Sequence, residues 1–177
     1  MSHLRVGPDH GSITVHTFRE GRARRVGHDL VLAVEQWTAT VAVDDAGAIT
    51  ALSLDIDARS LRVLEGLGGL KPLSDKDRRD IRGTIDAEVL GGQPITFRCD
   101  AVERAGDRMT MPGELTVAGR TRTVAPHVAA GPDGRVSGTI PLVQSDWGIR
   151  PYSTMMGALK VRDAVDVVVD VRLPQEA

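Results

Sequence analysis

The most constraining feature of this sequence is a two-residue alternation of apolar and polar side chains that returns along most of the chain. Ile13 and Val15 occupy one face of an extended segment, while Thr14 and His16 occupy the other. A period of two fits a β-strand and no helix. The alternation recurs in eight segments, which cover residues 13–18, 30–35, 37–43, 52–57, 95–100, 115–117, 136–142 and 165–172. We therefore expect a mainly β protein.

Turn sequences separate these segments at hairpin spacing, at 44–47, 118–121 and 131–134. Short strands at this spacing are typical of an antiparallel sandwich or barrel, and eight strands can close into a barrel. Aromatic residues make up only 3% of the chain, so the inward positions are mostly smaller aliphatic side chains. This composition favours an unfilled apolar channel; the alternative is that the aliphatic side chains pack against a helix or a second sheet.

One segment, residues 74–89, predicts a helix. Ser74 and Asp77 have the spacing of a capping box, with aspartate in place of glutamate. Glycines at 91–92 and Pro94 supply the stop. Three apolar residues recur every fourth position, as on one helical face: Ile81, Ile85 and Val89.

Two segments between predicted elements have unusual composition. Residues 64–73 are apolar but rich in glycine, which predicts an ordered yet mobile loop. Arg22, Arg24 and Arg25 form a basic loop beside His28. These arginines either form a solvated connection, which we favour, or bind a lipid phosphate.

Composition excludes several classes of protein. The 177 residues suit a single domain over 1–177, and a net charge of −2 gives no electrostatic reason to bind nucleic acid. The single cysteine, Cys99, cannot form an intrachain disulfide. No apolar run approaches 18 residues and no secretory signal opens the chain, so we expect a cytoplasmic location. The abundance of arginine over lysine fits a GC-rich bacterial gene.

No catalytic motif stands out: the sequence lacks a P-loop, HExxH, paired CxxC, GxSxG and SxxK. Cys99 shares a strand face with Phe97, which indicates a buried apolar residue and no nucleophile. His10, His28 and His127 could form a metal site only through tertiary contacts, and turn or surface roles are favoured. We predict no catalytic residue, metal or cofactor.

The order of the segments resembles the YceI-like family, the bacterial polyisoprenoid-binding, lipocalin-like proteins. The most specific likenesses are GELTVAGRTRTV at 113–124 and QSDWGI at 144–149. Weaker likenesses lie at 9–15, 77–80 and 93–97. The resemblance implies an eight-stranded antiparallel barrel with a helix packed on it and a pore for a long apolar chain. Departures at 89–94 and 64–73 predict a remodelled pore mouth.

This resemblance implies non-enzymatic binding of an isoprenoid, a quinone-like molecule or a fatty acyl chain. Alternation makes twelve residues candidates for lining the pore: Ile13, Val15, Leu30, Leu32, Leu52, Leu54, Phe97, Leu115, Val117, Ile140, Leu142 and Trp147. Five more are candidates for its mouth: Leu67, Leu70, Met155, Met156 and Leu159. The alternatives are a self-filled barrel that binds other proteins and, less favoured, a metal-dependent enzyme built on histidines. The sequence leaves the oligomeric state open, a homodimer included.

Overall fold

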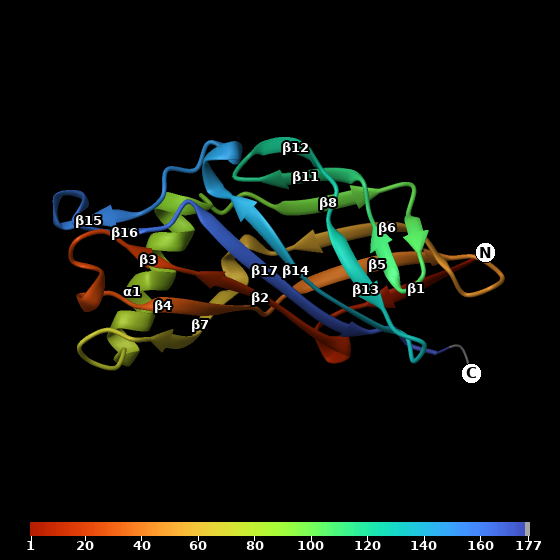
Figure 1. Cartoon of the computed structure of the whole chain (residues 1–177), viewed down its shortest axis with the longest axis horizontal. Helices are drawn as coiled ribbons and strands as arrows, with labels where there is room; N and C mark the ends of the chain where they lie inside the picture. Colours follow the sequence, from red (N-terminus) through yellow and green to blue (C-terminus); the bar gives the residue numbers. More distant parts are fainter. Residues whose placement is uncertain (176–177) are drawn as a thin grey trace.

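The computed structural model describes residues 1–175 as an elongated β structure with one α-helix near one end and the N-terminus at the other (Figure 1). We call these the helix end and the N-terminal end. All strand pairs are antiparallel. Mainly β structure is what the alternation predicted, and the single α-helix was predicted separately from residues 74–89.

Two large sheets form the body of the molecule, and a small third sheet extends the helix end. The six-stranded sheet has the order β1 (Ser2–Val6), β5 (Trp37–Val43), β6 (Ile49–Ile56), β8 (Ile95–Cys99), β11 (Gly113–Val117), β12 (Arg120–Val124). The eight-stranded sheet has the order β7 (Leu61–Leu67), β4 (Asp29–Val34), β2 (Gly11–Thr17), β17 (Ala164–Arg172), β14 (Arg135–Val143), β13 (His127–Ala130), β10 (Arg108–Thr110), β9 (Glu103–Ala105). The third sheet has the order β15 (Ser153–Thr154), β16 (Leu159–Val161), β3 (Arg19–Glu20).

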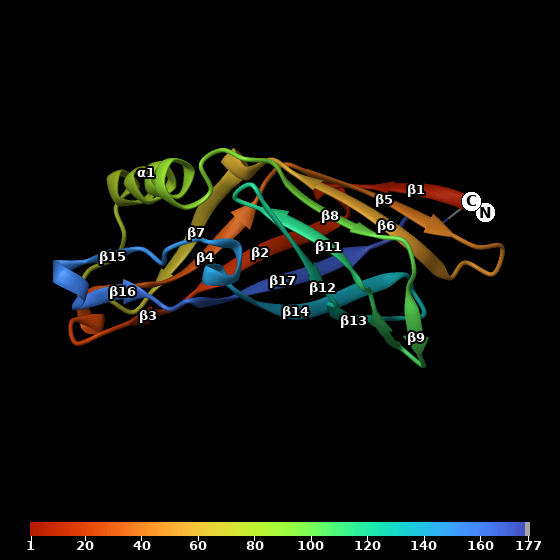
Figure 2. The ribbon, with the colours of Figure 1, turned by 90° about the horizontal axis from the view of Figure 1, so that it is seen from above.

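The predicted closed barrel of eight strands is wrong. Within residues 1–175 each sheet ends at two free edges, for example β7 and β9 in the larger sheet. Alternation reveals which face of a strand is apolar, but closure depends on long-range pairing that no local pattern encodes. The two open sheets instead enclose the interior between their apolar faces (Figure 2).

The helix forms where it was expected. The α-helix α1 (Asp75–Thr84) continues into one π-helical turn, η4 (Ile85–Val89). Ser74 Oγ accepts a hydrogen bond from the Asp77 N–H at 3.1 Å, and Asp77 Oδ2 accepts one from the Ser74 N–H at 2.9 Å. This completes the predicted capping box. Short 3-10 turns occupy Pro8–His10, Arg24–Val26, Ala58–Ser60, Gln144–Trp147 and Met155–Gly157.

The predicted loop 64–73 is half strand. β7 extends to Leu67, so only the residues from Gly68 to the helix form the connection. Gly66 did not prevent pairing, because its partner Leu30 lies on the adjacent strand β4 and supplies the ladder. Gly68 and Gly69, both with φ of +76°, then turn the chain in a conformation that favours glycine.

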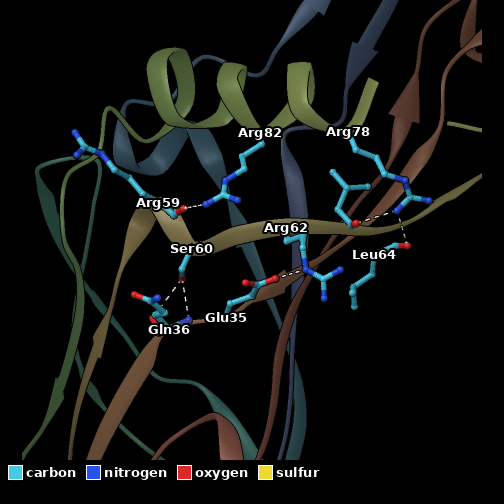
Figure 3. A network of polar contacts seen from close by, with 9 residues as sticks. Glu35, Gln36, Arg59, Ser60, Arg62, Leu64, Arg78 and Arg82 are labelled. Atoms are coloured by element: carbon cyan, nitrogen blue, oxygen red, sulfur yellow. Dashed lines mark hydrogen bonds and ion pairs between the residues drawn. The ribbon is translucent and has the colours of Figure 1, made fainter. Parts of the chain in front are cut away.

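Two chain segments connect the two large sheets at the same place. Residues 35–36 lead from β4 to β5, and the turn at Ala58–Ser60 leads from β6 back to β7. The Glu35 N–H donates to the Ser60 carbonyl at 3.0 Å, and the Gln36 N–H donates to Ser60 Oγ at 3.0 Å. Ser60 is buried, so this hydroxyl joins the two crossings inside the molecule (Figure 3).

Candidate ligand-binding cavity

A cavity of about 510 Å³ lies between the two large sheets. Its lining comes from the inner faces of both sheets and from the inward side of α1 and η4. In each sheet the lining residues form rows across adjacent strands, because residues directly opposite each other point to the same face. One row runs through Val167, Val15 and Leu32, and another through Ala39, Leu54, Phe97 and Leu115.

All twelve residues that the alternation placed inward line this cavity. Ile13 and Leu32 are buried on the larger sheet, and Phe97 is buried on the smaller one. Trp147 is buried in the turn after β14, where its indole N–H donates to the Leu115 carbonyl at 3.0 Å.

Several lining residues were missed. Ile81, Ile85 and Val89 face the cavity from the helix, and their spacing of four already marked one apolar face. Met109 and Val128 also line it, from β10 and β13. They belong to a cluster with Phe97, Cys99 and Met111 that packs around one part of the cavity. These short strands gave no signal, because three or four residues are too few for a period to show.

Polar side chains are few in the lining and come from particular elements. Among the described residues, the polar residues that line the cavity, besides the two tryptophans, are Thr17, Asp80, Thr84, Gln144 and Tyr152. Asp80 and Thr84 belong to α1, and Tyr152 immediately precedes β15. Asp80 and Tyr152 are also exposed to solvent. The cavity therefore meets the surface at the helix end, beside Asp80 and Tyr152.

The five residues expected at the mouth do not line the cavity. Four of them, Leu67, Leu70, Met155 and Met156, are exposed hydrophobic side chains. Leu159 is partly buried, and its side chain lies against Gly27. They nevertheless lie on the loops and strands of the helix end, the end at which the cavity opens (Figure 1).

Arginines from the helix hold α1 over the free edge of the larger sheet (Figure 3). Arg78 donates from Nη1 to the carbonyls of Val63 and Leu64, each at 2.9 Å, and Arg82 donates from Nη2 to the Arg59 carbonyl at 2.8 Å. The β4–β7 pairing shifts register beside Leu64. Arg78 thus binds carbonyls of an edge strand at an irregular point of its ladder, which fixes the helix over the cavity.

Cys99 and the three histidines considered for a metal site do not line the cavity. Cys99 is buried, and this burial raises the pKa of its thiol, which lies 3.2 Å from the Ala101 carbonyl. The three histidines considered for a metal site have separate partners. His10 Nδ1 accepts from the Gly7 N–H, His28 Nε2 lies 2.7 Å from the Lys71 carbonyl, and His127 Nδ1 lies 2.8 Å from Thr110 Oγ1. No group of three or more His, Cys, Asp or Glu side chains within residues 1–175 could hold a metal ion.

The family model for the YceI-like domain matches residues 5–173. The chain belongs to the YceI-like family, which is generally described as polyisoprenoid-binding. No curated protein matches the sequence. Among solved structures, Burkholderia cenocepacia BcnA is 17% identical, with a TM-score of 0.66 over 93% of this chain and 96% of BcnA. The Campylobacter jejuni YceI protein is also 17% identical, with a TM-score of 0.57 over 82% of this chain and 85% of that protein. At this identity the likeness shows the shared fold.

None of the helices within residues 1–175 is long and apolar enough to cross a membrane.

Proposed function

We propose that this YceI-like protein binds a long apolar amphiphile, such as an isoprenoid, a quinone-like molecule or a fatty acyl chain, in its interior cavity. The observation that supports this most directly is the cavity itself. Its volume of about 510 Å³ lies in the range of small-molecule sites, about 300–1,000 Å³. Its walls are aliphatic and aromatic apart from a few residues at the helix end.

Energetics favour an occupied cavity. Engineered core cavities cost about 24 cal/mol per Å³. The present cavity opens to solvent, so that scale gives only the sign: unfilled apolar walls lower stability, and a ligand that packs against them raises it. Each buried CH₂ group of a ligand would return about 0.8 kcal/mol, so a long chain could bind tightly with few polar contacts.

The uneven placement of polar residues gives the ligand a direction. The apolar tail would extend toward Phe97 and Met109, which line the cavity and are buried. The head would stay near Thr84, Gln144 and Tyr152 at the helix end, where hydrogen-bonding groups reach the cavity. Such a site selects by chain length and head-group size more than by specific hydrogen bonds.

The lining favours binding without catalysis. Among the described residues, Asp80 and Tyr152 are the ionisable side chains in the lining, and both are exposed at its opening. An interior of this volume favours an open cavity over the self-filled core that the protein-interaction alternative assumes. We therefore propose a carrier or sequestering protein. A cytoplasmic location and a homodimer stay predictions, to be checked by cell fractionation and light scattering.

The direct test is to identify what the protein holds. The purified protein would be extracted with organic solvent, and the extract compared by mass spectrometry with an extract of the Leu54→Trp variant, whose cavity is obstructed. We expect a long-chain lipid in the wild-type extract alone. The delipidated protein should then take up a fluorescent long-chain fatty acid. If the wild-type extract holds no lipid and the delipidated protein takes up neither this probe nor a polyprenol, the proposed function is wrong.

A further inference from the structure

Three surface segments meet at the helix end and share an unusual composition. They are residues 21–28 between β3 and β4, residues 67–74 between β7 and α1, and residues 152–161 around β15 and β16. We call them together the tip. Hydrogen bonds tie them to one another. The Ala23 N–H donates to the Ala158 carbonyl at 2.8 Å, and His28 Nε2 lies 2.7 Å from the Lys71 carbonyl. Both views show them side by side (Figures 1 and 2).

Large apolar side chains project from the tip into solvent. Met156 is fully exposed, and Leu70 is 74% exposed. Met155 and Met156 have φ of 54° and 55°, a left-handed conformation that is uncommon for residues other than glycine, and Gly157 follows with φ of 85°. The exposed apolar side chains of the tip are Val26, Leu67, Leu70, Tyr152, Met155 and Met156. Several large exposed apolar side chains at one end of a molecule are typical of a contact surface.

The same surface is basic, although the chain as a whole has a net charge of −2. The three segments contain no Asp or Glu, and their basic residues are Arg22, Arg24, Arg25, Lys71 and Lys160. Two carboxylates flank the first segment. Glu20 Oε1 lies 3.6 Å from Lys160 Nζ, and Asp29 Oδ1 lies 3.7 Å from Arg19 Nε. The three arginines form no ion pair with another of the residues 1–175. Exposed apolar side chains beside unpaired cations match the interface of an anionic bilayer.

We propose that the tip docks this protein onto anionic phospholipid membranes. Met155, Met156 and Leu70 enter the boundary between head groups and acyl chains, while Arg22, Arg24 and Arg25 contact lipid phosphates. The cavity opens beside Tyr152, which belongs both to its lining and to the tip. Docking would therefore present the opening to the bilayer. The docking itself depends only on the surface, whereas its use for loading and release of a lipid rests on the proposed function.

Co-sedimentation with vesicles tests the docking. The delipidated protein would be mixed with vesicles of phosphatidylcholine alone or of phosphatidylcholine with phosphatidylglycerol, at low and at high sodium chloride. We expect binding to the anionic vesicles, weakened by salt, and little binding to the neutral ones. Met155→Ser with Met156→Ser should weaken binding at least about tenfold. The matched pair Met155→Leu and Met156→Leu should retain it.

The role of charge is tested in the same assay. Replacing Arg22, Arg24 and Arg25 by Ser should weaken binding at least about tenfold, because each basic residue near an anionic surface contributes about fivefold. The matched control replaces Arg5, Arg104 and Arg108, which are exposed on β1, β9 and β10 away from the tip, and should bind like wild type. Wild-type protein that stays unbound with anionic vesicles at low salt would overturn the docking, as would an equal loss in both arginine triples.

The cavity-obstructed variant Leu54→Trp separates the two proposals. It should still bind anionic vesicles, since the tip is unchanged. If wild type and variant both bind vesicles but wild type takes up no long-chain lipid, the docking stands and the proposed function fails. If wild type takes up lipid but does not bind vesicles, the proposed function stands and the tip serves another contact.

Discussion

The hydroxyl of Ser60 accepts a hydrogen bond from the backbone N–H of Gln36 at 3.0 Å. The two residues belong to the two neighbouring segments that connect one large sheet to the other. The proton of the Ser60 hydroxyl points to the Asp57 carbonyl at 2.7 Å. The backbone of Ser60 also accepts from the Glu35 N–H. One small buried residue therefore holds the two connections between the sheets together.

Ser60→Ala should lower the free energy of unfolding by about 1–3 kcal/mol, because the Gln36 N–H would lose its partner inside the protein. Urea unfolding followed by circular dichroism would measure this. Ser12→Ala, at an exposed position of β2, is the control and should change stability by a few tenths of a kcal/mol at most. Equal stability of both variants would mean that the crossing does not depend on this hydroxyl.

Arg78→Ala should loosen the helix from the edge strand β7, since two carbonyls lose a charged donor. Hydrogen bonds to charged groups contribute about 1.5–3 kcal/mol each when sheltered, and this site is only half-buried, so we expect a loss of about 1–2 kcal/mol in total. Amide hydrogen exchange should show faster exchange in α1. The adjacent Arg79 is exposed, and Arg79→Ala should leave exchange in α1 unchanged. Equal acceleration in the two variants would assign the effect to helix propensity.

The start of α1 should weaken in acid. The Ser74 N–H, which donates to Asp77 Oδ2, and next the Ser74 hydroxyl hold the pKa of the Asp77 carboxyl below its usual value. A lowered pKa in the folded state stabilises the protein above the ordinary pKa of aspartate, and this contribution is lost as the pH falls through the folded value. Exchange protection in the first turn of α1 should therefore drop as the pH falls below about 4, the ordinary pKa of aspartate. Asp77→Asn should remove that pH dependence, and a wild-type profile in this variant would contradict the prediction.

Local chemistry explains what could be predicted from the sequence. The Ser74–Asp77 box and the spacing of Ile81, Ile85 and Val89 define the helix within a single segment. Likewise, each strand's alternation determines which residues face inward, which is why the eleven pore candidates on strands line the cavity, whereas Trp147 lines it from the turn after β14. The larger arrangement could not be predicted in this way. The chain changes sheets at residues 35–36, where the buried positions shift by one residue, from Leu32 and Val34 to Trp37. A shift of one residue does not tell a bulge within one sheet from a crossing into a second sheet.

The mouth was harder to predict for a related reason. Met155, Met156 and Leu70 were selected because they are apolar, and an apolar residue in a loop has no partner strand to assign its face. The structure places them on the outside of the helix end, where long-range contacts such as that between Ala23 and Ala158 gather the loops. Cavity lining by Met109 and Val128 also depends on strands too short to show a period.

Cys99 should resist thiol reagents in the folded protein. Burial raises the pKa of its thiol, so little thiolate forms at neutral pH, and the sulfur is also shielded. We expect labelling by a maleimide only at the rate of unfolding, with fast labelling in denaturant. The raised pKa favours the protonated thiol in the folded state, so stability should fall once the pH exceeds about 8.5, where the unfolded thiol ionises. Cys99→Ala should show less of this alkaline loss, whereas fast labelling of the native protein would show that the strand β8 opens.

The last prediction concerns the cavity. Leu54→Trp adds an indole ring to the row between Ala39 and Phe97, and Val117→Phe adds a phenyl ring on β11. In an open cavity either ring has room, so the free energy of unfolding should change little while uptake of a long-chain fatty acid is lost. In a close-packed core the same change would cost about 1–3 kcal/mol. Ser53→Trp, which adds a ring on the opposite face of β6, is the matched control and should leave uptake intact.

Melting must be compared after delipidation, since a bound lipid would itself raise the stability of the wild type. A different pair of results would contradict this prediction: both cavity variants are strongly destabilised, and the delipidated wild type takes up no lipid. The interior would then be packed, and the protein would carry no ligand there.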